Sequence, residues 1–171
     1  MSLQEKNRLA TFRLQKVFSL TLILFVIVLS IVSFDYVRAK VRDKKRKADL
    51  RQINAALNIY YDKYHNFPEA EDKDWAGWDA TYEPAGNVSS FLDVLYEKKI
   101  IDFVPTDPVN NEFYHYRYKK YPAGVYGCKR SFYVLQIVNF EGNESNHGRA
   151  SCPEQDFVEW AQNGYSIQVF E

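Results

Sequence analysis

Glycine and proline are absent from the first 67 residues of this 171-residue chain. Because these two residues interrupt helices most strongly, nothing in the sequence obliges a helix that begins near Leu14 to end before Asn66. Histidine is also scarce, and its three copies, at His65, His115 and His147, lie in separate segments. With no hydrolase, metalloprotease or nucleotide-binding motif beside them, the sequence predicts a protein that is not an enzyme.

The net charge is zero, with 22 Lys and Arg against 22 Asp and Glu, but the charges are unevenly placed. Residues 1–51 carry 12 basic and 4 acidic side chains, whereas residues 52–171 carry 10 basic and 18 acidic ones. This asymmetry predicts a basic and an acidic segment in different surroundings. In an assembly of parallel copies, we expect the two segments to attract each other between staggered neighbours, an attraction that salt weakens.

A single run of 18 residues, 17–34, contains no charged side chain, although the mean hydropathy of the chain is only −0.42. Its length is at the lower limit for a helix across a hydrocarbon core about 30 Å thick. A cleaved signal peptide is the alternative, because four Lys and Arg residues precede the run. A signal peptide's apolar region is usually shorter and ends in small residues, whereas Phe34, Asp35 and Tyr36 end this one. The run therefore predicts a retained transmembrane helix.

We predict four segments: a cytoplasmic basic leader at 1–16, a transmembrane helix at 17–34, an amphipathic continuation of that helix at 35–66, and a head at 67–171. The sequence gives two conflicting indications of orientation. Four Lys and Arg precede the run and eight lie in residues 38–51, and this excess of cations after the run would place the head in the cytoplasm. Cys128 and Cys152, the only cysteines, suit one disulfide in an oxidising compartment, with two free thiols as the alternative. We give the cysteines more weight and predict a single-pass protein of the cytoplasmic membrane with an extracytoplasmic head.

The second half of the predicted helix is amphipathic. Its apolar side chains recur at intervals of three and four, and we expect them to form the core between helix and head: Leu50, Ile53, Leu57, Tyr60 (or Tyr61) and Tyr64. The basic stretch 42–47 (RDKKRK) lies between the two halves, and we predict a solvated helix face there, at the membrane surface.

After Pro68 the composition changes to turn-forming and aromatic residues. Residues 87–101 predict a short helix capped by Ser89 or Ser90, and alternating patterns predict strands at 113–121, 131–140 and 165–170. The fold class is therefore α+β, with one long N-terminal helix packed against a small antiparallel sheet.

An acidic loop partly matches the calcium pattern D-x-D-x-[DN]-G-x5-E, with Asp72, Asp74 and Glu83 as candidate ligands. The fifth position is Ala76, which has no side-chain oxygen, so a solvated acidic loop is the favoured interpretation. A second oxygen-rich stretch, 139–144, is a weaker calcium candidate. No cofactor is predicted apart from this possible calcium.

Aromatic and basic residues alternate in strand 113–121 and include Tyr114, Tyr116, Arg117, Tyr118 and Lys119. Stacking rings beside cations are used to bind single-stranded nucleic acid, but burial of the tyrosines in a sheet generates the same pattern. We favour burial, with nucleic acid as a minor alternative partner.

The chain resembles type IV pilins and the pseudopilins of type II secretion. The resemblance lies in a single N-terminal apolar helix continuing into ADLRQINAALNIYYDKYHNFP (48–68), in IIDFVPTDPVNNEFYHYRY (100–118), and in the C-terminal region bracketed by the two cysteines. It implies a subunit whose helices bundle inside a filament while the heads form its surface, with other pilin-like subunits and an assembly platform as partners.

Two positions depart from the family's processing motif. Where prepilins have a Gly before the cleaved bond and a Glu as fifth residue of the mature helix, this chain has Val17 and Leu22. We therefore predict a minor pilin or pseudopilin that acts by helix-mediated assembly. The alternative is a non-polymerising membrane protein whose pilin-like head binds DNA, glycan or calcium.

Overall fold

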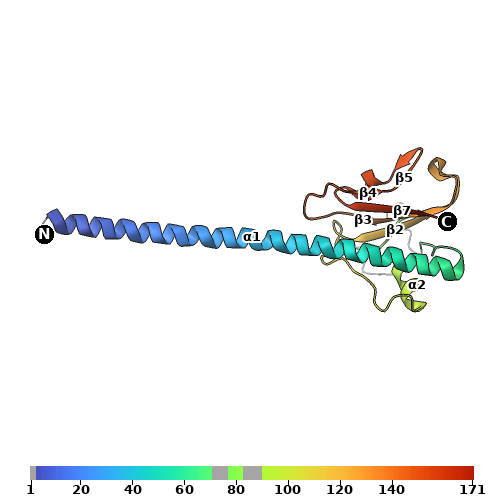
Figure 1. The fold of residues 1–171 in the computed structure, drawn as a ribbon, viewed down its shortest axis with the longest axis horizontal. Helices are drawn as coiled ribbons and strands as arrows, with labels where there is room; N and C mark the ends of the chain where they lie inside the picture. Colours follow the sequence, from blue (N-terminus) through green and yellow to red (C-terminus); the bar gives the residue numbers. More distant parts are fainter. Residues whose placement is uncertain (1–2, 71–76, 83–89) are drawn as a thin grey trace. The chain divides into compact units, whose positions relative to one another are not determined.

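The computed structural model describes residues 3–70, 77–82 and 90–171, in two compact units, Met1–Lys40 and Val41–Glu171. One helix, α1 (Leu3–Tyr64), begins in the first unit and ends in the second (Figure 1). Its length follows from the absence of glycine and proline before Pro68. It ends where His65 adopts a left-handed backbone with φ of 57°.

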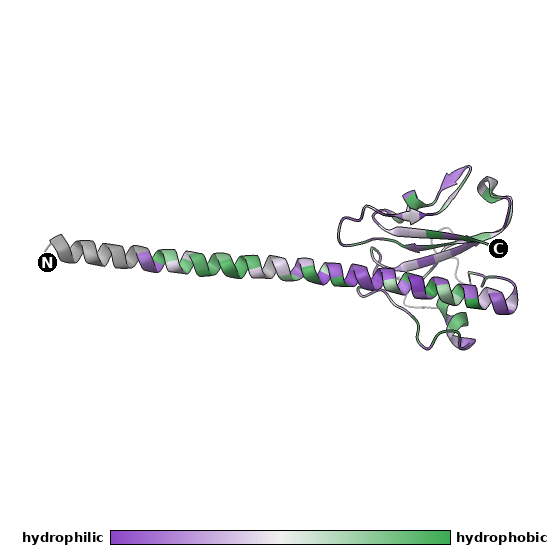
Figure 2. Cartoon of the chain, viewed as in Figure 1, coloured by the Kyte–Doolittle hydropathy of each residue, from purple (hydrophilic) through white to green (hydrophobic). Residues whose placement is uncertain are grey.

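The first unit is helical from Leu3 onwards, and the large apolar side chains that the structure describes there are exposed. The large apolar residues between positions 17 and 29 are 49–70% exposed, and Figure 2 shows this part of α1 as predominantly green. Within Gln15–Tyr64, α1 is long and apolar enough to cross a membrane. The prediction of a helix with these properties is confirmed.

The second unit is built around a five-stranded sheet with the order β1-β2-β3-β7-β4. These strands are β1 (Asp79–Ala80), β2 (Tyr116–Tyr121), β3 (Phe132–Ile137), β7 (Tyr165–Phe170) and β4 (Gly148–Arg149). The hairpin of β5 (Ser151–Cys152) and β6 (Gln155–Asp156), the helix α2 (Phe91–Glu97) and the 3-10 turns η1 (Val125–Gly127) and η2 (Val158–Ala161) complete the unit. The predicted α+β class with one long helix is therefore confirmed.

The sheet is mixed, which corrects the expectation of an antiparallel one. β3 pairs antiparallel with β2 and β7, but β4 runs parallel to β7. At the parallel contact Gly148 has φ of 80°, and a Cβ there would lie 2.0 Å from the carbonyl oxygen of Ser166. The close approach requires glycine, and a two-residue strand gives no periodic signal from which it could be predicted.

One face of the sheet packs against α1 and α2. Leu50, Ile53 and Leu57 of α1 are at most 2% exposed and join a core formed by alternate residues of β2 and β3. Tyr60 packs against this core while partly exposed, and Tyr64 is also partly exposed, with its ring 4.5 Å from that of Tyr60. The predicted helix face is thus the face that the sheet contacts.

The opposite face carries a second core, which the sequence did not reveal. All six residues of β3 are buried, because the odd and even positions point into different clusters. The second cluster contains Trp78, Tyr121, Phe132 and Phe157 with the two cysteines. The sheet is therefore covered on both faces.

Helix α2 is shorter than the predicted 87–101, of which residues 87–89 lie outside the described part of the chain. Ser90 is its N-cap: the Ser90 hydroxyl accepts the N–H of Leu92 at 3.3 Å, and Asp93 accepts the N–H of Ser90 at 2.9 Å. The helix then presents Phe91 to the sheet, where its ring stacks on Tyr118 with centroids 4.8 Å apart.

We expect Leu57→Ala to lower the free energy of unfolding by about 2–5 kcal/mol, because it leaves a cavity at a fully buried position. Ile59→Ala is the matched control on the same helix turn, since Ile59 is 53% exposed, and should change it by less than about 0.5 kcal/mol. Urea unfolding of the full chain in an uncharged detergent, followed by tryptophan fluorescence, measures both. Equal losses would contradict the assigned core.

Candidate functional site

The most constrained polar group among the described residues is Arg46 of α1, whose side chain is completely buried. Its guanidinium donates to Asp107 through Nε (2.7 Å) and Nη2 (3.0 Å), a bidentate pair. Its Nη1 donates to Asp43 (2.6 Å) and to Glu141 (2.8 Å). One buried arginine is thus held by three carboxylates.

These carboxylates come from three parts of the chain. Asp43 lies one turn before Arg46 on α1, Asp107 lies in the loop between α2 and β2, and Glu141 lies in the loop after β3. Arg42 also pairs with Glu141, and we call these five residues the Arg46 cluster. The cluster therefore fixes two loops of the second unit to residues 42–46 of α1.

Backbone groups hold the carboxylates in place. Asp107 accepts the N–H groups of Val109 (2.8 Å) and Asn110 (3.3 Å), while Asp43 accepts those of Glu141 (3.1 Å) and Gly142 (2.9 Å). These backbone N–H groups replace water around the carboxylate oxygens and keep the oxygens in position to bind the guanidinium.

The pKa shifts follow from this geometry. Burial lowers the pKa of Arg46, but its hydrogen bonds to Asp107 and Glu141 outweigh burial and raise the pKa above its ordinary value. The hydrogen bond from Arg42 has the largest effect on Glu141 and lowers its pKa. Desolvation raises this pKa and the hydrogen bond from Arg46 lowers it, so that the net shift is downward. Arg46 and Glu141 therefore both keep their charge over the neutral range.

The Arg46 cluster corrects in part the prediction that residues 42–47 form a solvated basic face, because Arg46 is buried while Lys44 and Lys45 are exposed. Arg42 and Arg46 bind carboxylates of the cluster, Lys45 pairs with Asp49, and Lys47 pairs with Glu144. Periodicity and composition could not show this, because three of these acidic partners, Asp107, Glu141 and Glu144, lie more than 60 residues away in loops. Four cations that we expected to attract neighbouring copies thus have carboxylate partners within the same chain.

Tyrosine hydroxyls of β2 and β3 also bind α1 and the segment after it. Tyr116 donates to Asp49 at 2.8 Å, Tyr133 donates to Asn54 at 2.7 Å, and Tyr118 donates to the carbonyl of Pro68 at 2.7 Å. Burial, together with the hydrogen bond to Asp49, raises the pKa of Tyr116. The tyrosines are thus amphipathic core residues.

This arrangement places the residues considered for nucleic-acid binding on different surfaces. Tyr116 and Tyr118 are completely buried on the α1 face, and Tyr114 is half-buried with its ring 4.7 Å from the guanidinium carbon of Arg46. Arg117 and Lys119 are half-buried on the opposite face. Buried rings cannot stack on bases, so the strand does not form the aromatic and basic surface that single-stranded nucleic acid requires.

The calcium candidates Asp72, Asp74 and Glu83 lie outside the described residues. In the second oxygen-rich stretch, Glu141 binds Arg42 and Arg46, and Glu144 binds Lys47. Within residues 3–70, 77–82 and 90–171, no three His, Cys, Asp or Glu side chains are grouped so as to hold a metal ion.

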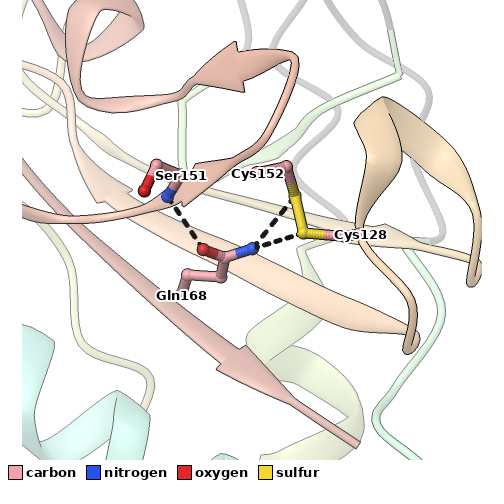
Figure 3. Close-up of a disulfide and its surroundings, with 4 residues drawn as sticks. All are labelled: Cys128, Ser151, Cys152 and Gln168. Carbon is pink, nitrogen blue, oxygen red and sulfur yellow. Dashed lines mark hydrogen bonds between the residues drawn. A yellow bond between two sulfur atoms is a disulfide. The ribbon is translucent and has the colours of Figure 1, made fainter.

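Cys128 and Cys152 form a disulfide in the second core. Gln168 of β7 lies beside it, with Nε2 at 3.6 Å and 3.4 Å from the two sulfurs and Oε1 accepting the N–H of Ser151 at 2.8 Å (Figure 3). The bridge ties the η1 turn to β5. Closing a loop of 24 residues stabilises a fold by about 3 kcal/mol in the chain-entropy model.

The fold and these contacts define an α+β protein with one long N-terminal helix that has the length and composition of a membrane span and one disulfide. In the comparisons with known proteins, no family model, no curated protein and no solved structure matches the chain.

We expect Arg46→Met to lower the free energy of unfolding by about 3–5 kcal/mol, because it leaves the buried Asp107 without its cation. Lys44→Met in the same stretch is the control and should have little effect, since Lys44 is exposed. Combined with Asp107→Asn, Arg46→Met should lose less than the sum of the single changes. Additive losses in urea titrations would show that the two residues do not interact.

We also expect acid to destabilise the second unit. The folded pKa of Glu141 lies below its ordinary value of 4.5, so its ion pairs contribute stability above about pH 4.5 and lose it as the pH falls through the folded pKa. Urea midpoints between pH 6 and pH 3 should therefore fall more steeply for the native chain than for Glu141→Gln. Glu159→Gln, at an exposed position of η2, should keep the native slope.

Proposed function

We propose that this chain is a single-pass, membrane-anchored pilin-like structural subunit, a minor pilin or pseudopilin of a type IV pilus or a type II secretion-like filament. The proposal rests on the contrast between an exposed apolar part and a buried apolar part of α1. Its apolar part, between residues 17 and 29, is exposed, whereas Leu50, Ile53 and Leu57 of the same helix are buried in a small α+β core.

The exposed part of α1 requires a cover. Eleven consecutive or nearly consecutive large apolar side chains at 49–70% exposure are far more than a soluble surface normally carries. Lipid tails cover such a helix when it is an anchor, and the helices of other copies cover it when it is assembled. In a filament subunit, lipid surrounds this part of the helix before assembly and the helices of other subunits surround it afterwards.

The buried part of α1 explains how a helix contact could position the rest of the subunit. Residues 42–57 are held to the sheet by the Arg46 cluster, by the hydroxyls of Tyr116 and Tyr133, and by the apolar core. A subunit that assembles through its helix needs this kind of attachment, because a loosely joined sheet would not transmit the helix register.

We place the head on the extracytoplasmic side. The disulfide supports this orientation, since such bonds persist in oxidising compartments. The larger number of cations after the apolar run favours the opposite orientation. However, four of the eight cations between residues 38 and 51 pair with carboxylates of the second unit, which weakens that argument.

A stationary anchor with a binding head is the second candidate. Val17 and Leu22 favour it, because they replace the Gly and Glu that the family uses for processing and subunit pairing. A retained leader would also carry Lys6, Arg8 and Arg13 into a bundle of apolar helices, where unpaired charge is very unfavourable.

The N-terminus of the protein purified from its native membrane separates the two candidates. Intact mass and N-terminal sequencing should give a chain that starts near Phe18 if it is a filament subunit. A chain that retains residues before Val17 would overturn the filament proposal and favour the stationary anchor. Val17→Gly restores the family residue and serves as the control, because it should be cleaved wherever the processing peptidase is present.

A further inference from the structure

Arg117 of β2 is the second arginine that the fold withdraws from water, and its surroundings differ from those of Arg46. It lies half-buried on the sheet face opposite α1. Its Nε donates to Oε1 of Gln136 at 2.7 Å, its Nη2 donates to the carbonyl of Trp160, and its guanidinium carbon lies 4.4 Å from the ring centroid of Trp78. All of these partners are uncharged.

Within the described residues, no carboxylate forms an ion pair with Arg117. Burial accordingly lowers the pKa of Arg117 to about 10, whereas the three carboxylates around Arg46 raise the pKa of that residue. A withdrawn cation with neutral partners has lost hydration without gaining a counter-charge. It therefore attracts an anion more strongly than a solvated surface arginine does.

A cavity of about 150 Å³ opens beside this guanidinium. Trp78, Ala80 and Val138 supply apolar walls, and all three are buried. His115 and Gln162 supply polar walls. An apolar pocket with one charged group and a few polar ones is the usual composition of a site for a small molecule, and this volume is below the 300–1,000 Å³ typical of drug-sized ligands.

The charges of the lining narrow the ligand class. Burial lowers the pKa of His115, so this imidazole is neutral at pH 7, and Arg117 is the only cation among the described residues of the lining. Glu112, exposed at the rim, adds a negative charge. A single arginine with a carboxylate nearby favours an anion of one charge over a phosphate dianion.

We propose that this cavity is a binding site for a small aliphatic monocarboxylate, with its carboxylate on Arg117 and its apolar tail between Trp78 and Val138. Arginine presents paired N–H groups that match a carboxylate, and the Trp78 ring keeps the guanidinium plane in place. The site lies on the sheet face away from α1, so it is independent of any assembly through the helix.

The test is a titration of the full chain in an uncharged detergent with butyrate, butyramide and inorganic phosphate, followed by tryptophan fluorescence and by saturation-transfer NMR of the ligand. Butyrate should bind saturably and at least tenfold more tightly than the isosteric butyramide, and phosphate should not bind. Equal binding of butyrate and butyramide, tighter binding of phosphate, or no binding of butyrate would each overturn the proposal.

Variants locate the site. Arg117→Gln should abolish the preference for butyrate over butyramide, whereas Arg130→Gln should leave it unchanged, since Arg130 is an exposed arginine over the ring of Phe170. Glu112→Gln should tighten butyrate binding severalfold by removing the negative charge at the rim. Because Glu112 is exposed, we expect this variant to fold, so it tests the proposed site even if Arg117→Gln does not fold. Unchanged or weaker binding by Glu112→Gln would contradict the site.

Discussion

The buried guanidinium of Arg46 is the interaction on which the second unit depends. Burying one charge without partners costs several kcal/mol, a large fraction of a typical domain's stability, so Arg46 is tolerated only because Asp43, Asp107 and Glu141 all contact it. These contacts require that α1, the loop before β2 and the loop after β3 take up their positions simultaneously. An apolar core alone would accept many packings, whereas this set of directional bonds accepts one.

The tyrosines extend the same constraint along the sheet. Tyr116 and Tyr133 contribute rings to the core and hydroxyls to polar groups of α1, so the helix face that meets the sheet is both apolar and hydrogen-bonded. Among the residues that the structure describes, the opposite face is covered by no α-helix; aromatic rings, the disulfide and the 3-10 turns η1 and η2 fill it. Arg117 belongs to that second face, which explains how two arginines of one small domain come to have such different partners.

Much of this fold could be predicted from the sequence because its signals are local. The long helix follows from the missing glycine and proline, and the α1 face of Leu50, Ile53 and Leu57 follows from their spacing. The strands β2 and β7 follow from alternation, and β3 follows from its run of strand-forming apolar residues. The two-residue strands gave no pattern. Burial of β3 on both faces was missed, although the continuous apolar run from Phe132 to Leu135 is typical of a strand covered on both sides. The Arg46 cluster was missed because a basic stretch beside an apolar run is typical of a membrane surface. The only local feature that indicated the cluster was Asp107 in the turn between Pro105 and Pro108. The calcium site at Asp72, Asp74 and Glu83 stays a prediction.

The disulfide also has a consequence for the order of folding. The ring that it closes, from Cys128 to Cys152, contains all of β3 together with Glu141, which binds Arg42 and Arg46, and Glu144, which binds Lys47. Once the ring is closed, these carboxylates explore a much smaller volume before they meet Arg46 and Lys47, because part of the loop entropy has already been lost. Oxidation thus prepares one side of the helix contact in advance. In a chain kept reduced, the entropy of this loop must instead be lost when Glu141 and Glu144 reach the cations of α1.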